Sequence, residues 1–267
     1  MMSLYDKLER LTRKRIFYLL LMLIPTILPP ITASGLGYLL SVSDFSLDVA
    51  AALFDYKSVY AHLMPVLHLA ILLAILILLV FRKRAGRFFS AFVVLNFVFT
   101  ILTQTMVSTT KYGLVVLTEL FIWYIIVTAL WIWEIALQKN DYSFKDGLRP
   151  WWLLPLAVIA FWDPDQAWNL SLSFFVYGFA PSAFCMISPI YLTILMFAYP
   201  RVNLPLLRIQ SFTGLIVGFL SLFISLIQAP SDGIYWILLH APLLIVSFYT
   251  FRRGLRLQPD MQPEIAK

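Results

Sequence analysis

YAHLMPVLHLAILLAILILLVFRKR, residues 60–84, is the stretch of sequence that decides the fold class of this chain. Its apolar run, residues 60–81, is long enough to cross the hydrocarbon core of a bilayer, because a transmembrane α-helix needs about 20 predominantly apolar residues. Three basic residues, Arg82, Lys83 and Arg84, follow at once. Short cytoplasmic loops carry an excess of Lys and Arg, so the run is predicted to be a transmembrane helix that ends on the cytoplasmic side.

Further apolar stretches continue this pattern along the chain. They are residues 16–40, 88–108, 112–137, 150–162, 169–199, 206–228 and 234–251. When all these stretches cross a membrane in turn from a cytoplasmic N-terminus, 18 of the 20 Lys and Arg residues fall on the cytoplasmic side. Only Lys57 and Lys111 fall on the other side. We therefore expect an all-α, polytopic integral membrane protein with about eight transmembrane helices and with both termini in the cytoplasm.

The stretch 150–162 is the shortest of these, and its length also fits a re-entrant or interfacial element. At 1.5 Å per residue it would be about 20 Å long, against a hydrocarbon thickness of about 30 Å. The charges favour a crossing, because without one Arg201 and Arg208 would lie outside. The connections are too short to fold independently, so we expect one transmembrane domain, residues 1–267, that ends in a mobile cytoplasmic tail, residues 254–267.

The composition excludes an ordinary soluble domain. Hydrophobic residues make up 61% of the chain and charged residues 13%, with a mean hydropathy of +0.85, whereas soluble domains carry about a quarter charged residues. The net charge of +6 does not indicate nucleic-acid binding, because the basic residues flank apolar stretches, where they set orientation and contact anionic lipid headgroups. We expect membrane lipids as partners, no nucleic acid, and residence in a cell membrane, plasma or inner.

Metal and redox chemistry lack a sequence signal. The one cysteine, Cys185, excludes an intramolecular disulfide. His62 and His68 are six residues apart, which places them on nearly opposite faces of a helix, so they do not form a local chelate. No nucleotide-binding or nucleophile motif is present. We therefore expect neither a metal site nor a cofactor.

Small and polar residues mark two helix faces. Gly214 and Gly218 form a GxxxG motif in 206–228, which indicates a face for close packing against a partner helix. In 88–108, Asn96 shares a face with Thr100 and Thr103, with Gln104 beside it. Such groups need hydrogen-bond partners in hydrocarbon, so they either join helices or line a polar cavity.

Glu119 is the most informative chemical group, because a carboxylate inside a membrane needs a partner or a proton. Counted from the outer ends of their stretches, His68 and His240 lie at a similar depth, and Gln104 and Tyr177 lie in the same half. These five residues are our candidates for binding a substrate or a proton. Whether they converge depends on how the helices are rotated, which the sequence leaves open.

Glu134 differs from Glu119 because it lies near the inner boundary and close to Lys139. We expect its side chain to reach water and to have a structural role.

The expected function is transporter-like, with a polar cavity in the outward half that handles a small or amphiphilic substrate and with proton coupling through Glu119. Two alternatives remain open. One is a membrane-embedded enzyme that acts on a lipid or isoprenoid substrate, with Glu119 and a histidine as acid and base. The other is a non-catalytic subunit of a membrane complex, which the GxxxG face would suit.

Overall fold

The computed structural model describes residues 3–34, 48–49, 52, 59–144, 150–162, 171–228 and 233–256. This part of the chain is mostly helical. Its α-helices are α1 (Leu4–Leu11), α2 (Arg15–Ile27), α4 (Met64–Phe81), α5 (Gly86–Gln104), α6 (Thr118–Leu137), α7 (Leu153–Phe161), α8 (Phe174–Tyr177), α9 (Phe184–Ala198), α10 (Leu204–Gln228) and α11 (Gly233–Arg256). Short 3-10 turns are η1 (Ala61–Leu63), η2 (Arg82–Ala85) and η3 (Ala180–Ser182), and the strands are β1 (Ile31–Thr32), β2 (Met106–Thr109) and β3 (Gly113–Val116).

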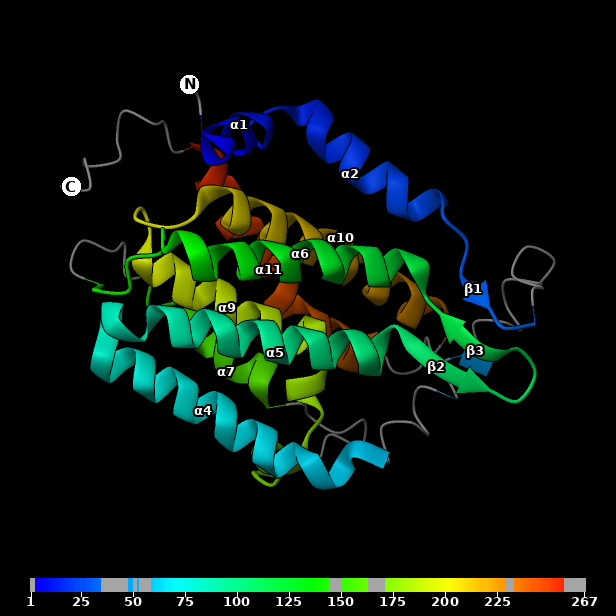
Figure 1. Ribbon diagram of the computed structural model, residues 1–267. Helices are drawn as coiled ribbons and strands as arrows, with labels where there is room; N and C mark the ends of the chain where they lie inside the picture. The colour runs from blue at the N-terminus through cyan, green and yellow to red at the C-terminus, as the bar shows by residue number, and fades with distance from the viewer. Residues whose placement is uncertain are drawn as a thin grey trace.

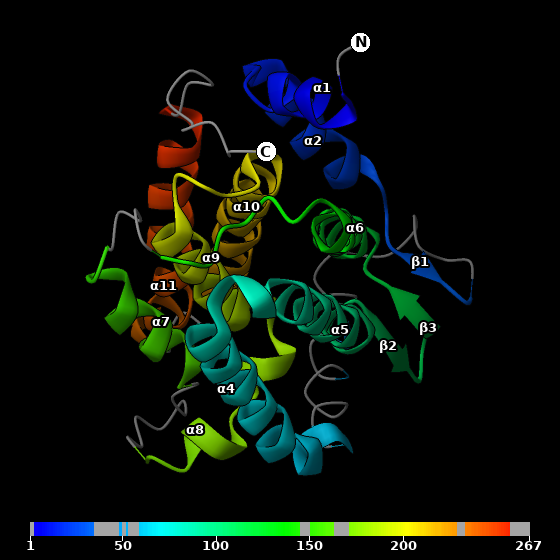
Figure 2. The same cartoon turned by 60° about the vertical axis from the view of Figure 1, so that its left-hand side comes forward.

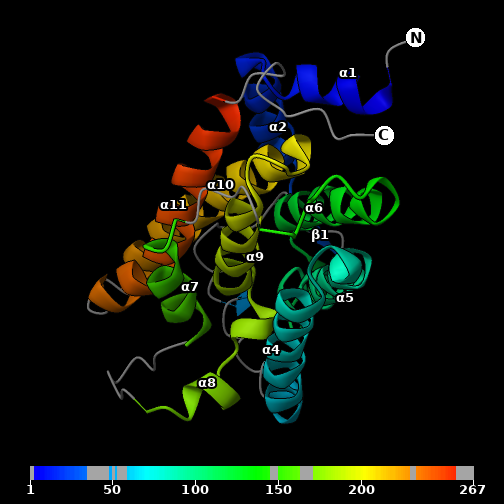
Figure 3. The ribbon, with the colours of Figure 1, turned by 90° about the vertical axis from the view of Figure 1, so that its left-hand side faces the viewer.

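The helices form two layers around α9. In Figures 1 and 2, α4, α5 and α6 lie side by side in one layer, and α7, α10 and α11 lie behind them. Helix α9 runs through the centre, and 12 of its 15 residues are buried. The end-on view in Figure 3 shows α9 between α11, α10 and α7 on one side and α4 on the other. The apolar helix α9 therefore lies at the core of the bundle.

Three segments are long and apolar enough to cross a membrane, as judged on the described residues by length and composition. They are Ala61–Gln104, Thr118–Leu137 and Leu204–Ile227. A fourth exists if Phe174–Ser182 and Phe184–Ala198, which meet at a bend of 91°, count as one broken span. The expectation of eight spans is therefore not confirmed, although the mostly helical fold and the presence of apolar helices agree with it. The predicted tail lies outside the described residues, except for Gly254 to Arg256.

A small sheet replaces the outer ends of three predicted spans. Strands β2 and β3 form an antiparallel hairpin, and β1 pairs with β3, so that the strand order is β1-β3-β2. Gly113, the first residue of β3 after the turn, has a φ of 66°, a conformation that favours glycine. The end of the predicted span 88–108 and the start of the predicted span 112–137 are therefore strands and not helix. The expectation of a purely α-helical chain is corrected in this respect.

Proline explains the other shortened spans. Helix α2 ends at Ile27, just before Pro29 and Pro30, because proline lacks the N–H that would continue a helix. The chain then extends into β1, and the remainder of the predicted span, residues 35–40, lies outside the described residues. In the predicted span 169–199, Pro181 lies in η3, at the bend that separates α8 from α9.

A buried carboxylate joins the helices at one end of the bundle. Glu134, near the end of α6, is only 2% exposed. Its two oxygens accept hydrogen bonds from the Asn140 backbone N–H and the Asn203 side-chain amide, both at 2.8 Å. Asn140 in turn accepts a bond from the Asn203 backbone N–H at 2.7 Å. The expectation that the Glu134 side chain reaches water is therefore wrong, because its carboxylate is buried and bonds to these asparagines.

The N-terminal helix α1 attaches to the same end. The Tyr5 hydroxyl accepts a hydrogen bond from the backbone N–H of Leu204, and Lys139 lies 5.0 Å above the Tyr5 ring. Burial, with the Glu9 carboxylate as the second cause, raises the pKa of Tyr5 to about 12. The hydroxyl therefore stays neutral over the physiological range, which suits its place against the start of α10.

Arg208 connects α1, α10 and α11 from a fully buried position. Its Nε donates to the Gly254 carbonyl at 2.8 Å, and one terminal nitrogen donates to the Glu9 carbonyl and the Thr12 hydroxyl, both at 3.1 Å. The basic segments that the charge analysis assigns to one side of the membrane therefore meet at one end of the bundle, at the left of Figure 1. We call this the basic end; it comprises α1, η2, residues 138–144, residues 199–203 and the last turn of α11.

The glycine face of α10 packs against α11 of the same chain. A Cβ on Gly214 would collide with the Ser247 hydroxyl, and one on Gly218 would come within 3.1 Å of Leu243 and Leu244 side-chain atoms. Both positions therefore depend on the absence of a side chain, as close helix packing in membranes requires.

The basic end generates a topology prediction. In a Cys185→Ser background, Lys83→Cys and Arg252→Cys should resist an impermeant maleimide added outside intact cells, whereas Lys111→Cys should react. All three positions are exposed, so protection would reflect the side of the membrane and not burial. Equal labelling of Lys83→Cys and Lys111→Cys would contradict the assignment of the basic end to the cytoplasm.

The glycine face generates a stability prediction. Gly214→Ala should lower the free energy of unfolding by about 1 to 3 kcal/mol, as overpacking typically does, and more than Gly218→Ala, whose neighbours are flexible leucine tips. Ser247→Gly should restore much of the loss in Gly214→Ala, because it removes the colliding hydroxyl. Thermal unfolding in detergent measures each step. Equal melting temperatures for both alanine variants would rule out the Ser247 contact as the cause.

Candidate functional site

An apolar groove lies between the two layers of helices. One cavity of about 470 Å³ is enclosed by α4, α7, α8 and α9, and a second of about 440 Å³ adjoins it towards the basic end. The two cavities share Ile75, Leu154, Thr193 and Ile194, so they are parts of one groove. We call it the α4–α9 groove. Each volume falls in the range of about 300 to 1,000 Å³ that is usual for small-molecule sites.

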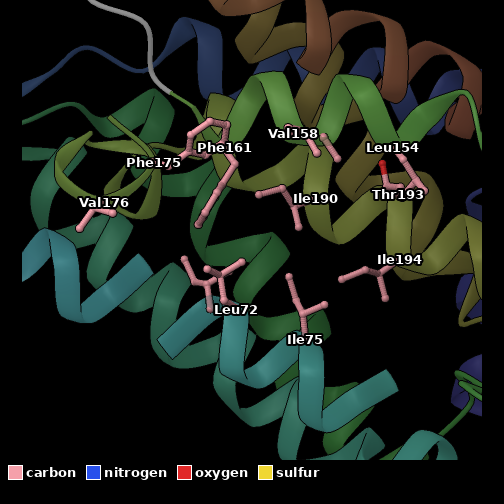
Figure 4. Close-up of a pocket in the computed structure, with 12 residues that line it drawn as sticks. Leu72, Ile75, Leu154, Val158, Phe161, Phe175, Val176, Ile190, Thr193 and Ile194 are labelled. Atoms are coloured by element: carbon pink, nitrogen blue, oxygen red, sulfur yellow. The ribbon is translucent and has the colours of Figure 1, made fainter. Parts of the chain in front are cut away.

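Branched aliphatic side chains line most of the groove. Figure 4 shows Leu72 and Ile75 of α4 facing Ile190 and Ile194 of α9 across the open space. Phe161 at the end of α7 lies beside the far end of the groove. The lining offers a hydrophobic chain many contacts and few hydrogen bonds.

The sequence creates this groove through the shape of its neighbouring helices. Helix α7 has only 9 residues, about 14 Å at 1.5 Å per residue, so it covers only part of the length of α4 and α9. The 91° bend between η3 and α9 sends α8 across the end of the groove, where Phe175 and Val176 contribute to the lining. The space therefore exists because α7 and α8 cover only part of the side of α4 that looks towards α9.

The end of the groove near the basic end has a different character. Arg82, Ser143 and Trp151 line the second cavity there, together with Phe197 of α9. Trp151 is 63% exposed and packs edge-on against the Phe197 ring at 5.2 Å. Tryptophan prefers the interface between hydrocarbon and headgroups. This end of the groove, which we call its mouth, therefore carries the kinds of side chain that are typical of a membrane interface.

The length of the groove can be compared with the thickness of a bilayer leaflet. From Ile71 to Arg82 the distance along α4 is about 17 Å at 1.5 Å per residue. Half of a hydrocarbon core of about 30 Å is about 15 Å. The length of the groove along α4 is therefore close to half the thickness of a hydrocarbon core.

One polar side chain lies within the apolar lining. Thr193 on α9 is 2% exposed and lines both cavities. Its hydroxyl has no hydrogen-bond partner among the described residues. A buried hydroxyl without a partner is costly, and most such groups in proteins are satisfied.

Glu119 lies in the first turn of α6 and not two turns inside a helix, because β3 takes up the residues before it. Its Oε1 is buried and has no hydrogen-bond partner among the described residues. In Figures 1 and 2, α5 separates α6 from α4, which carries His68. No hydrogen bond or ion pair joins Glu119 to His68 or His240 in the described part of the chain.

The two histidines are both buried, on different helices. His68 is 2% and His240 is 3% exposed. The Nδ1–H of His68 donates to the Met64 carbonyl at 2.8 Å, and its ring packs edge-on against Phe161 at 4.7 Å. Because Phe161 lines the α4–α9 groove, His68 lies next to its far end.

The remaining predicted site residues have separate surroundings. Gln104 accepts hydrogen bonds from the Tyr124 hydroxyl at 3.3 Å and from the Phe184 backbone N–H at 2.9 Å, so it joins α5 to α6 and α9. Tyr177 is 62% exposed at the end of α8. On α5, Asn96 bonds to the Pro181 carbonyl and the Tyr191 hydroxyl, which is interhelical bonding.

No family model, no curated protein and no solved structure matches this chain. The function must therefore be inferred from the groove and its surroundings. Sequence reasoning missed the groove, because residues such as Leu72 and Ile194 look like ordinary apolar positions. Among the lining residues, Arg82 was noticed in the sequence, because it is the first basic residue after the apolar run 60–81, but this position indicated the end of a helix and not a groove.

The separation of Glu119 from His68 generates a prediction. Glu119→Gln and His68→Gln should change the free energy of unfolding independently, so that the double variant equals the sum within about 0.5 kcal/mol. Thermal unfolding of the four proteins in detergent gives the coupling. A coupling above about 1 kcal/mol would mean that the two side chains share a site.

Proposed function

We propose that this protein is an integral membrane protein that binds a long-chain amphiphile, such as a lipid or isoprenoid, in the α4–α9 groove. The observation that carries this proposal is the continuous apolar groove, with cavities of about 470 and 440 Å³. Its lining matches a hydrocarbon chain, and its length matches one leaflet. The exposure of Leu72 and Val158, at 52% and 54%, supports entry of the chain sideways from the bilayer.

The side of the membrane follows from charge. The basic end holds nine of the 20 Lys and Arg residues, and segments rich in such residues tend to face the cytoplasm. We propose residence in a cell membrane with the mouth of the groove in the cytoplasmic leaflet. The chain would then exchange with lipids of that leaflet.

A transporter-like function with proton coupling is a second candidate. What supports it is Glu119, whose buried carboxyl oxygen has no hydrogen-bond partner among the described residues. Intramembrane acids of this kind often belong to ion or proton pathways. The surroundings of Gln104 and Tyr177 give less support to a shared polar cavity, so the apolar groove is the better basis for function. Flux of protons or solutes in proteoliposomes, abolished by Glu119→Gln, would favour this candidate instead.

The proposed function predicts that bulk in the groove expels the amphiphile. Ile75→Trp and Leu72→Trp should each lower photo-crosslinking by a diazirine-bearing phospholipid in proteoliposomes about tenfold, equivalent to 1.4 kcal/mol. Crosslinked peptides, mapped by mass spectrometry, should include the α9 segment around Ile194 in the wild type.

Leu73→Trp is the matched control, because Leu73 is 51% exposed and does not line either cavity. Monodispersity and melting temperature check that all variants are folded. Equal crosslinking in Ile75→Trp and Leu73→Trp would show that the label reports surrounding lipid and not the groove.

A further inference from the structure

Arg82 stands at the mouth of the groove. It is exposed and lines the second cavity. Among the described residues it makes no hydrogen bond or ion pair. By contrast, Arg201 pairs with Asp141. A guanidinium presents several N–H donors in a fork that matches the oxygens of a phosphate. Arg82 lies at the mouth of an apolar groove, so it would attract the anionic headgroup of an amphiphile whose chain occupies the groove.

Among the described residues of the neighbouring turn, the acidic residue Asp141 does not pair with Arg82. Asp141 accepts a hydrogen bond from the Ser143 backbone N–H at 3.0 Å and pairs with Arg201 at 3.4 Å. Burial acts to raise the pKa of Asp141, but the bonds from Ser143 and the Arg201 and Lys83 charges outweigh it, and the pKa lies below its ordinary value. Asp141 is therefore a compensated carboxylate, and Arg82 remains available to a ligand.

Thr193 supplies a second, independent observation. Its buried hydroxyl lines the groove and lacks a partner among the described residues. It lies one helical turn before Phe197, which is at the mouth, so it is about 6 Å deeper. The headgroup region of a bilayer is about 5 to 8 Å thick on each side. The hydroxyl is therefore at the depth where the glycerol oxygens of a lipid lie when its phosphate is at the mouth.

We propose that the α4–α9 groove holds one phospholipid of the leaflet at the basic end, with its phosphate at Arg82, a glycerol ester or ether oxygen at Thr193 and one chain along the lining towards Phe161. This assignment rests on the proposed function and adds the headgroup and the orientation of the ligand. The phosphate accepts from the guanidinium, and the glycerol oxygen accepts from the threonine hydroxyl. The ligand would thereby give a partner to the two groups of the groove, Arg82 and Thr193, that have none among the described residues.

The test compares two lipids that differ only in headgroup. The full-length protein is incubated in detergent with phosphatidylglycerol or phosphatidylcholine of identical acyl chains, and bound lipid is counted by native mass spectrometry. The wild type should retain the anionic lipid in preference. Arg82→Gln should lower that preference about tenfold, equivalent to 1.4 kcal/mol. Arg84→Gln is the matched control, because Arg84 is also exposed in η2 but does not line the groove.

Thr193 is tested by isosteric change. Thr193→Val should weaken both lipids several-fold without lowering the melting temperature of the lipid-free protein, because the hydroxyl has no partner there to lose. Thr193→Ser should restore binding. A valine variant that binds both lipids like the wild type would overturn the assignment of the glycerol oxygen.

The outcomes separate this inference from the proposed function. If Ile75→Trp expels both lipids while Arg82→Gln and Arg84→Gln change the preference equally, the groove binds lipid and the headgroup assignment is wrong. If Ile75→Trp leaves both lipids bound, the proposed function fails and the headgroup assignment fails with it.

Discussion

One buried carboxylate, that of Glu134, joins the helices at the basic end, and the positions of the other helices there depend on it. Glu134 accepts hydrogen bonds from Asn140 and Asn203, which fixes α6, the 138–144 turn and α10 against one another. An uncompensated buried carboxylate is costly, so both asparagines are required once the acid is there. Because α10 is held in place, Arg208 can bind α1 and α11. Because the turn is held in place, Ser143 lies at the mouth of the groove beside Arg82.

The groove results from the different packing of α4 and α9. Helix α9 is almost wholly buried, whereas α4 leaves many of its leucines exposed. In water an open apolar groove would tend to close, because burying its lining is favourable. In a bilayer that driving force between helices is absent, since lipid chains are as apolar as leucine. An apolar groove beside α4 would therefore stay open in a membrane, which is consistent with the proposal that it binds a lipid chain.

Several features of the fold could be predicted because they depend on local sequence. The apolar runs around α4, α6 and α10 agree with segments able to cross a membrane. The hairpin of β2 and β3 was missed, although Met106–Thr109 and Gly113–Val116 are rich in β-branched residues around a turn with glycine. The miss has a physical reason, because short valine-rich segments next to apolar helices also fit a continuing membrane helix. The predicted site was limited in another way: depth along a helix is readable from the chain, but rotation about its axis is not, so Glu119, His68 and His240 could be placed in one layer and yet not be paired.

By itself, the sequence determined that the chain forms apolar helices and that its basic residues lie in short segments between them, because hydropathy and charge act residue by residue. It also determined that Gly214 and Gly218 allow close packing, because glycine has no side chain whatever its neighbour. Only the tertiary structure decided that this neighbour is α11, that Glu134 is buried between two asparagines, and that Thr193 and Arg82 open onto one groove. These relations join residues far apart in the chain, and they depend on helix rotation and packing, which no local pattern specifies.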